Sequence, residues 1–78
     1  MSIFLVYKYV ILKLYSSSIL IGIYDSKNKA ILGIQEYIEI NNLQNLDKYD
    51  KSCLKDLNTT QGRIYNFAIE VNKINNLI

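Results

Sequence analysis

The sequence predicts an α+β fold: a three-stranded antiparallel sheet in the strand order 2-1-3, with one main helix packed on one face and a second, weaker helix. Three observations predict this fold. The first segment has the residues of a strand and is apolar on both sides. A second strand runs directly into an amphipathic helix, and in a later segment apolar and polar residues alternate strictly. With 78 residues, the chain (residues 1–78) makes one small domain, whose single core yields only about 3 to 5 kcal/mol of net stability.

The first predicted strand, residues 3–14, is rich in β-branched and aromatic residues and contains no Gly or Pro. Its odd-numbered and its even-numbered positions are both mainly apolar, which is typical of a central strand that is covered on each side. Residues 15–18 supply a polar turn, and residues 19–24 return as a second strand. We therefore expect the two segments to pair antiparallel.

The main helix is predicted to begin at Asp25 and Ser26, because side-chain oxygens of these types accept hydrogen bonds from the free amides of a helix start. Gly33 flanks its apolar stripe, at a place where another part of the chain can approach closely. Asn41 and Asn42 end the helix, since Asn tolerates the left-handed conformation found at helix C-termini. The stripe itself consists of Ala30, Ile31, Ile34, Tyr37, Ile38 and Asn41.

A second, weaker helix is predicted over residues 46–57, because apolar residues again share one helical stripe there. Asp47 near its start and Lys55 near its end suit the helix dipole. The rival interpretation makes residues 52–57 a strand, which pairs through a turn at 58–62 with the segment that follows.

The last predicted strand covers residues 63–72, where apolar and polar side chains alternate in the manner of a half-buried strand. Its apolar side consists of Tyr65, Phe67, Ile69 and Val71. Residues 73–78 form a tail that can add a final turn against the core.

The compartment follows from the first segment and from the cysteine count. Residues 3–24 are apolar, but Lys8 and Lys13 lie within them, and the serines at 16–18 divide them into pieces shorter than the roughly 20 residues that a membrane helix needs. Cys53 is the single cysteine and can close no intramolecular disulfide. We expect no membrane association and a reducing, cytoplasmic setting, in a host cell or a virion if the protein is viral.

The chain offers little chemistry for catalysis. It contains no His, the usual general base and transition-metal ligand. Cys53 falls on the apolar stripe of the second helix, which predicts a buried, inert thiol. Asp47, Asp50 and Asp56 lack the spacing of a calcium loop. We therefore expect no enzymatic activity, no cofactor, no metal site and no small-molecule substrate.

One face of the sheet is expected to be an interface, because a single main helix covers only one face. Tyr7 and Tyr9, on the odd-numbered side of the first strand, are expected to form the core under this helix. The even-numbered side is then an outward apolar patch, and such a patch on a small domain is typical of an interface. A second copy of the chain in a homodimer, another protein or the helix at 46–57 is expected to cover it. The candidate interface residues are Phe4, Val6, Lys8, Val10, Leu12 and Tyr24.

The alternative function is weak binding of single-stranded nucleic acid, because aromatic side chains on an open sheet can stack bases. Tyr7, Tyr9, Tyr24 and Tyr65 are the aromatic candidates, and Lys8 with neighbouring lysines supplies charge. Two observations oppose it: a core under the helix explains Tyr7 and Tyr9, and a net charge of +2 is too small to imply a polyanion partner. The sequence favours a noncatalytic interaction or structural accessory protein.

A short signature spans the end of the second predicted strand and the start of the helix. It consists of Gly22, Tyr24, Ser26, Lys29 and Ala30. This pattern resembles small uncharacterised strand-strand-helix-strand proteins of phages, prokaryotes and large DNA viruses, whose closing strand the segment 65–72 also resembles; the segment 43–62 departs from it as an insertion. The resemblance implies a fold and no established activity.

The source is predicted from amino-acid usage. Ile, Asn, Lys and Tyr, which have AT-rich codons, make up 37 of the 78 residues, whereas Gly, Ala, Pro and Arg together make up six. This bias indicates an AT-rich genome and, with the resemblance, favours a viral protein.

Overall fold

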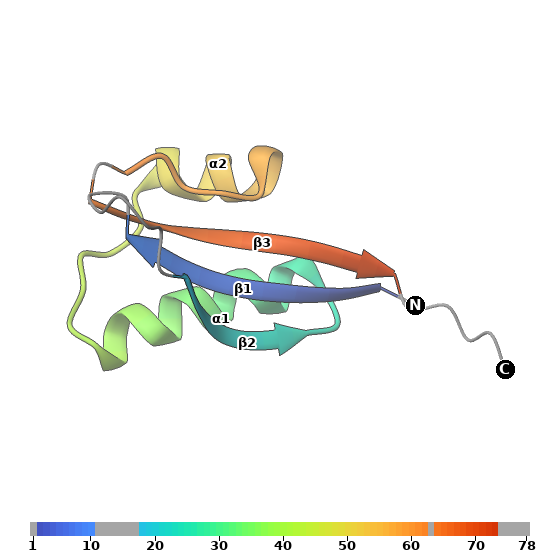
Figure 1. Ribbon diagram of the computed structural model, residues 1–78. Helices are drawn as coiled ribbons and strands as arrows, with labels where there is room; N and C mark the ends of the chain where they lie inside the picture. The colour runs from blue at the N-terminus through green and yellow to red at the C-terminus, as the bar shows by residue number, and fades with distance from the viewer. Residues whose placement is uncertain (1, 11–17, 63, 74–78) are drawn as a thin grey trace, which may run out of the picture.

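The computed structural model describes residues 2–10, 18–62 and 64–73. Its elements in chain order are β1 (Ser2–Val10), β2 (Ser18–Tyr24), α1 (Lys27–Ile40), α2 (Lys48–Leu57) and β3 (Tyr65–Lys73) (Figure 1). The strands form one antiparallel sheet in the order β2-β1-β3, which confirms the predicted fold class and strand order. Predicted features at residues 11–17, Arg63 and residues 74–78 lie outside the described residues.

Helix α1 begins where the sequence predicts, because Ser26 caps it. The Ser26 hydroxyl oxygen accepts a hydrogen bond from the backbone amide of Lys29 at 3.2 Å. At the other end, the Asn41 amide donates to the Tyr37 carbonyl, and Asn42 adopts the left-handed conformation with φ 53°. The two asparagines therefore end the helix by the mechanism that their residue type predicts.

Helix α2 begins at Lys48, two residues later than predicted, because Asp47 forms a capping box with Asp50. The Asp47 carboxylate accepts from the Asp50 amide at 2.8 Å, and the Asp50 carboxylate accepts from the Asp47 amide at 3.2 Å. The helix is confirmed, and the rival strand at residues 52–57 is wrong. None of the helices in the described ranges is long and apolar enough to cross a membrane.

The core lies between one face of the sheet and the two helices (Figure 1). Helix α1 packs on β1 and β2, and α2 lies along β3. Both helices contribute to a single buried cluster: Val6, Ala30, Ile34, Ile38, Leu54, Phe67 and Ile69. Phe67 is its largest member, and its ring meets those of Tyr37 and Tyr65 edge to face, with ring centroids 5.9 and 5.7 Å apart.

Tyr24 fills a gap that two glycines leave between the sheet and α1. A Cβ atom on Gly22 of β2 would lie 2.8 Å from the Tyr24 hydroxyl oxygen, and a Cβ atom on Gly33 of α1 would overlap the same ring. Gly33 is fully surrounded in the helix interior, where glycine is otherwise unfavourable by about 1 kcal/mol relative to alanine. The sequence predicts that another part of the chain approaches Gly33 closely, and in the structure the Tyr24 ring does so.

A short segment after α2 covers the free edge of β3. Asn58 ends α2 in the left-handed conformation, and Thr59 then forms an isolated bridge with Ala68 of β3. The Thr60 amide donates to the Phe67 carbonyl at 3.0 Å. At residues 67–69, β3 thus has a partner on each side, which satisfies backbone groups that an edge strand leaves exposed.

Asn66 holds the turn that brings this segment back to β3, although its place in the alternation predicts a polar outward residue. It is 5% exposed. Its Oδ1 accepts from the Thr60 hydroxyl at 2.7 Å and from the Gly62 amide at 2.5 Å, while its Nδ2 donates to the Gly62 carbonyl at 3.2 Å. One buried side chain therefore satisfies three polar groups of the turn.

We expect Asn66→Ala to lower the free energy of unfolding by about 2 kcal/mol, because the substitution leaves buried polar groups without partners. Equilibrium urea denaturation measures this loss. Asn72→Ala on the same strand is the matched control, since Asn72 is exposed. If Asn66→Ala lowers the free energy of unfolding no more than Asn72→Ala does, the hydrogen bonds of Asn66 do not stabilise the turn as described.

Candidate functional site

The even-numbered side of β1 lies under the helices, so the predicted outward position of this side is wrong. Val6 is fully buried in the cluster that contains Ala30 and Ile34 of α1. Phe4 is half-buried and packs against the same cluster, as does Tyr24. These three members of the candidate interface are core residues.

The other predicted interface residues of β1 lie near the border of this core. The Lys8 ammonium lies 5.1 Å from the centre of the Tyr65 ring, within the range of a cation–π contact. Val10 pairs with Tyr65 across the sheet and is half-buried. Leu12 lies outside the described residues. The five candidates that the structure describes therefore do not form an outward patch.

The side of β1 that faces the helices is the opposite of the predicted one. Both sides of β1 are apolar, so its packing against β3 and α1 determines which side is buried. Directly opposed residues in an antiparallel pair point to the same face. Val6 is opposite Ile69, and Lys8 is opposite Phe67. The buried side chains of β3 thus draw the even-numbered residues of β1 into the core, and Lys8 is tolerated because its ammonium reaches Tyr65.

The opposite side of the sheet carries an apolar surface, which we call the outer face. It consists of Ile3, Leu5, Tyr7 and Tyr9 of β1 with Leu20 and Ile23 of β2. The β1 members are half-buried, whereas Leu20 and Ile23 are 48% and 57% exposed. Tyr7 and Tyr9 therefore lie away from the helices, and their predicted place in the core under the main helix is wrong.

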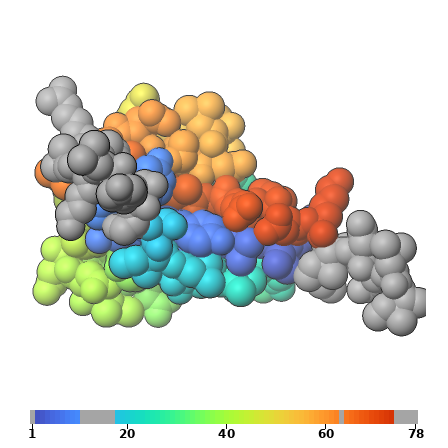
Figure 2. Space-filling model, in the orientation of Figure 1, coloured from blue at the N-terminus to red at the C-terminus, as the bar shows by residue number. Residues whose placement is uncertain are grey.

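The three strands form the near surface of the molecule in Figure 2, with parts of α1 and α2 visible at its borders. On β3 the residues opposite the outer-face residues of β1 are Asn66, Ala68, Glu70 and Asn72, which pair with Tyr9, Tyr7, Leu5 and Ile3 in that order. The Tyr9 hydroxyl lies 3.3 Å from the Thr59 hydroxyl, so the segment that covers β3 also meets this face. The outer face is apolar over β1 and β2 and becomes polar over β3.

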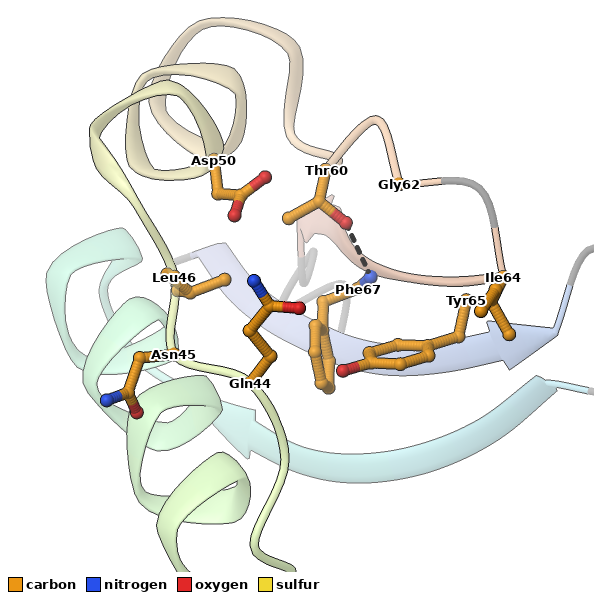
Figure 3. Close-up of a pocket in the computed structure, with 9 residues that line it drawn as sticks. All are labelled: Gln44, Asn45, Leu46, Asp50, Thr60, Gly62, Ile64, Tyr65 and Phe67. Atoms are coloured by element: carbon orange, nitrogen blue, oxygen red, sulfur yellow. Dashed lines mark hydrogen bonds between the residues drawn. The ribbon is translucent and has the colours of Figure 1, made fainter.

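A second feature is a cavity of about 220 Å³ near the start of α2 (Figure 3). Gln44 and Asp50 extend toward it, and the rings of Tyr65 and Phe67 form its floor. It is lined by Gln44, Asn45, Leu46, Asp50, Thr60, Gly62, Ile64, Tyr65 and Phe67.

Thr60 and Asp50, two of the polar residues around this cavity, already have structural partners. The Thr60 hydroxyl oxygen accepts from the Phe67 amide at 3.0 Å, the contact drawn in Figure 3, and donates to Asn66. The Asp50 carboxylate caps α2. The cavity is also smaller than the 300 to 1,000 Å³ or so of typical small-molecule sites. Its size and these contacts therefore give little support to a small-molecule site.

The side chains that could serve catalysis are dispersed or buried. Among the residues that the structure describes, no three of the types His, Cys, Asp and Glu gather as a metal site. A hydrogen bond with the Cys53 side chain is the main cause that raises the pKa of the exposed Tyr49 phenol above its usual value of 10.0.

Cys53 is 5% exposed in the face of α2 that packs on the core, as its place on the apolar stripe predicts. We expect its thiol to react at least about 100-fold more slowly with Ellman's reagent in the native protein than in urea, because the reagent must wait for local opening. Absorbance at 412 nm measures the two rates. Equal rates contradict the buried position of this thiol.

Comparison with known proteins adds no assignment: no protein-family model, no curated protein and no solved structure matches the chain. The resemblance to small strand-strand-helix-strand proteins stays a prediction. The outer face is thus the candidate functional site. It consists of the odd-numbered residues of β1 and their β2 neighbours, whereas the sequence predicts an interface on the even-numbered side of β1.

Proposed function

We propose that the protein is a noncatalytic interaction protein that binds protein through the outer face of its sheet, and that its partner is a second copy of the same chain. One observation carries the proposal: the apolar residues of β1 and β2 on this face lie on the side of the sheet away from both helices. Large apolar patches of this kind on small soluble domains mark interaction sites.

The size of the domain supports self-association. A chain of 78 residues gains little from one core, and association is one of the ways in which such chains gain stability. The AT-rich codon usage and the resemblance to proteins of phages and large DNA viruses favour an accessory or structural role in a virus.

The test is the mass of the protein in solution over a range of concentrations, measured by sedimentation equilibrium. The double variant Leu5→Glu/Tyr7→Glu places two charges on the outer face and should convert the dimer to a monomer. The matched control is Leu32→Glu/Ile40→Glu, since these α1 side chains are 62% and 72% exposed and lie away from the sheet. A dimer that survives the outer-face variant, or a wild-type chain that is monomeric at every concentration, contradicts the proposal.

Single-stranded nucleic acid is a second candidate, and the position of Tyr7 and Tyr9 favours it, because both rings lie on the open side of a sheet. The charges give it less support. Lys8 turns to the other side of the sheet, and Glu70 shares the face with the tyrosines.

Fluorescence anisotropy of a labelled oligothymidine tests this second candidate. Binding must weaken as salt rises, because phosphate contacts release counterions. Tyr7→Ala/Tyr9→Ala should abolish it, whereas Tyr49→Ala on α2 serves as the control, since Tyr49 is exposed elsewhere. No binding at low salt removes nucleic acid as a partner.

A further inference from the structure

The two edges of the sheet differ. Beside β3, residues 58–60 supply backbone hydrogen bonds at 3.0 and 2.7 Å and a bridge between Thr59 and Ala68. Beside β2, the strand order leaves no neighbour on the side away from β1 among the described residues. Among the described residues, the β3 edge is therefore covered at residues 67–69, and no strand lies beside the β2 edge (Figure 1).

The covered edge fixes the direction of the backbone groups. The amides of Phe67 and Ile69 donate to residues 58–60, away from β1. Successive residues of a strand direct their N–H and C=O groups to opposite sides, so Ala68 directs its groups toward β1. Its partner there is Tyr7. The odd-numbered residues of β1 thus bond to β3, and the even-numbered ones direct their groups toward β2.

The same alternation continues into β2. Lys8 pairs with Ile19, so the backbone groups of Ile19 face β1 and those of Leu20 face the open edge. Ile23 also faces the open edge, because its neighbour Tyr24 pairs with an even-numbered residue of β1. Leu20 and Ile23 are members of the outer face as well. At these two residues, exposed apolar side chains and unpaired backbone groups coincide.

We propose that the open edge of β2 pairs antiparallel with the β2 strand of a second copy, so that two sheets join into one continuous sheet. The proposal rests on the self-association put forward above, and it places the contact between the two copies at the β2 border of the outer face, at Leu20 and Ile23, in place of the whole face. An unpaired row of N–H and C=O groups selects an extended strand as its partner. The β2 sequence SILIGIY contains neither a charge nor a proline, the residue types that commonly block such pairing.

Self-pairing of β2 suits this partner. A two-fold axis brings the same strand against itself in the antiparallel direction. Because β2 carries no charge, this approach places isoleucine and leucine side chains against each other with no like-charge repulsion. It also joins the two outer faces along their β2 borders into one apolar surface.

The other edge of each copy is less available for a further pairing. After β2 pairs, the remaining edge is that of β3, and residues 58–60 already occupy it at residues 67–69. The bulge between Val6 and Tyr7 in the β1–β2 register places Ile21 as the extra residue of β2 and limits regular pairing to short stretches around Leu20 and Ile23. These features favour a closed dimer over an open fibre.

The experiment compares two substitutions at one position. Leu20→Pro removes the amide at the open edge and leaves the bonds between β1 and β2 in place, and proline is tolerated at such edges. Leu20→Ala shortens the side chain and keeps the amide. We expect Leu20→Pro to lower the dimer association constant in sedimentation equilibrium at least about tenfold below that of Leu20→Ala, since symmetry removes the bond twice.

Amide hydrogen exchange of the wild-type protein provides a measurement that does not depend on the folding of a variant. The Ile19 and Tyr24 amides should be protected at every concentration, whereas those of Leu20 and Ile23 should become protected only as the dimer forms. Leu20 and Ile23 amides that exchange freely in the dimer overturn the strand pairing.

The outcomes separate this pairing from the proposed function. A dimer that survives Leu20→Pro and dissociates in Leu5→Glu/Tyr7→Glu overturns the strand pairing and leaves the outer face as the binding surface. A dimer with the opposite response supports the strand pairing and contradicts the outer face.

Discussion

Val6→Asp is expected to unfold the protein. Val6 is fully buried. It lies in the same cluster as Ala30 and Ile34 of α1, and it is paired with Ile69 of β3. A carboxylate at this position is a buried charge without a partner, which costs about 4 kcal/mol or more. That cost matches or exceeds the net stability of about 3 to 5 kcal/mol that a domain of this size obtains from one core.

The adjacent variant Tyr7→Asp is the control, because its side chain points to the other face. Tyr7 is half-buried on the outer face, so the aspartate reaches water and the loss is about 1 kcal/mol. Far-UV circular dichroism with urea denaturation measures both variants. A folded Val6→Asp protein together with an unfolded Tyr7→Asp protein indicates that the sides of β1 lie as the sequence predicts.

Gly33→Ala is expected to destabilise the protein by about 2 kcal/mol, which reverses the sign of the usual effect. In an ordinary helix interior this substitution stabilises by about 1 kcal/mol, because alanine loses less backbone entropy. Here the added Cβ overlaps the Tyr24 ring, which is held between Gly22 and Gly33. Either the ring or α1 must shift, and overpacking of this kind costs about 1 to 3 kcal/mol.

A double-mutant cycle with Tyr24→Leu checks this cause. Leucine lacks the outer ring atoms that lie against Gly33, so Gly33→Ala should become neutral or stabilising in the Tyr24→Leu protein. Thermal and urea denaturation of the four proteins give the coupling free energy, expected at about 2 kcal/mol. If Gly33→Ala destabilises both backgrounds equally, the ring contact is not its cause.

The fold could be predicted to a large extent because its elements are defined by local signals. Ser26 and Asp47 are side chains that cap helices, and each starts a helix in the structure. Asn42 supplies the left-handed residue after α1. The strand order followed from one further feature, a first strand that is apolar on both sides and so belongs in the centre.

The candidate site could not be predicted, because it depends on which side of β1 the helices cover. Periodicity shows only that both sides are apolar. The choice is made by distant partners: Phe67 and Ile69 on β3 and the helix α1 with its glycine opening for Tyr24. Lys8 supported the wrong prediction, because a lysine usually places its side of a strand toward water. In the structure it lies on the side of the core, where its ammonium contacts the Tyr65 ring.

Asn66 illustrates the same point at a single residue. In the alternation of β3 it is a polar residue on the wet side, yet three hydrogen bonds from the turn bury it. No pattern in one sequence indicates these contacts, because they join residues that a turn alone brings together. An asparagine close after a loop that contains Gly62 is the only local hint.

The strand order β2-β1-β3 also has a consequence for the synthesis of the chain. The central strand β1 is made early, but one of its two neighbours is β3, which comes last among the elements. Until residues 65–73 have left the ribosome, β1 lacks one of its two neighbouring strands, and the core lacks Phe67 and Ile69. The apolar side chains of β1 and β2 therefore stay uncovered until β3 has been made, and exposed apolar surface of this kind promotes aggregation during folding.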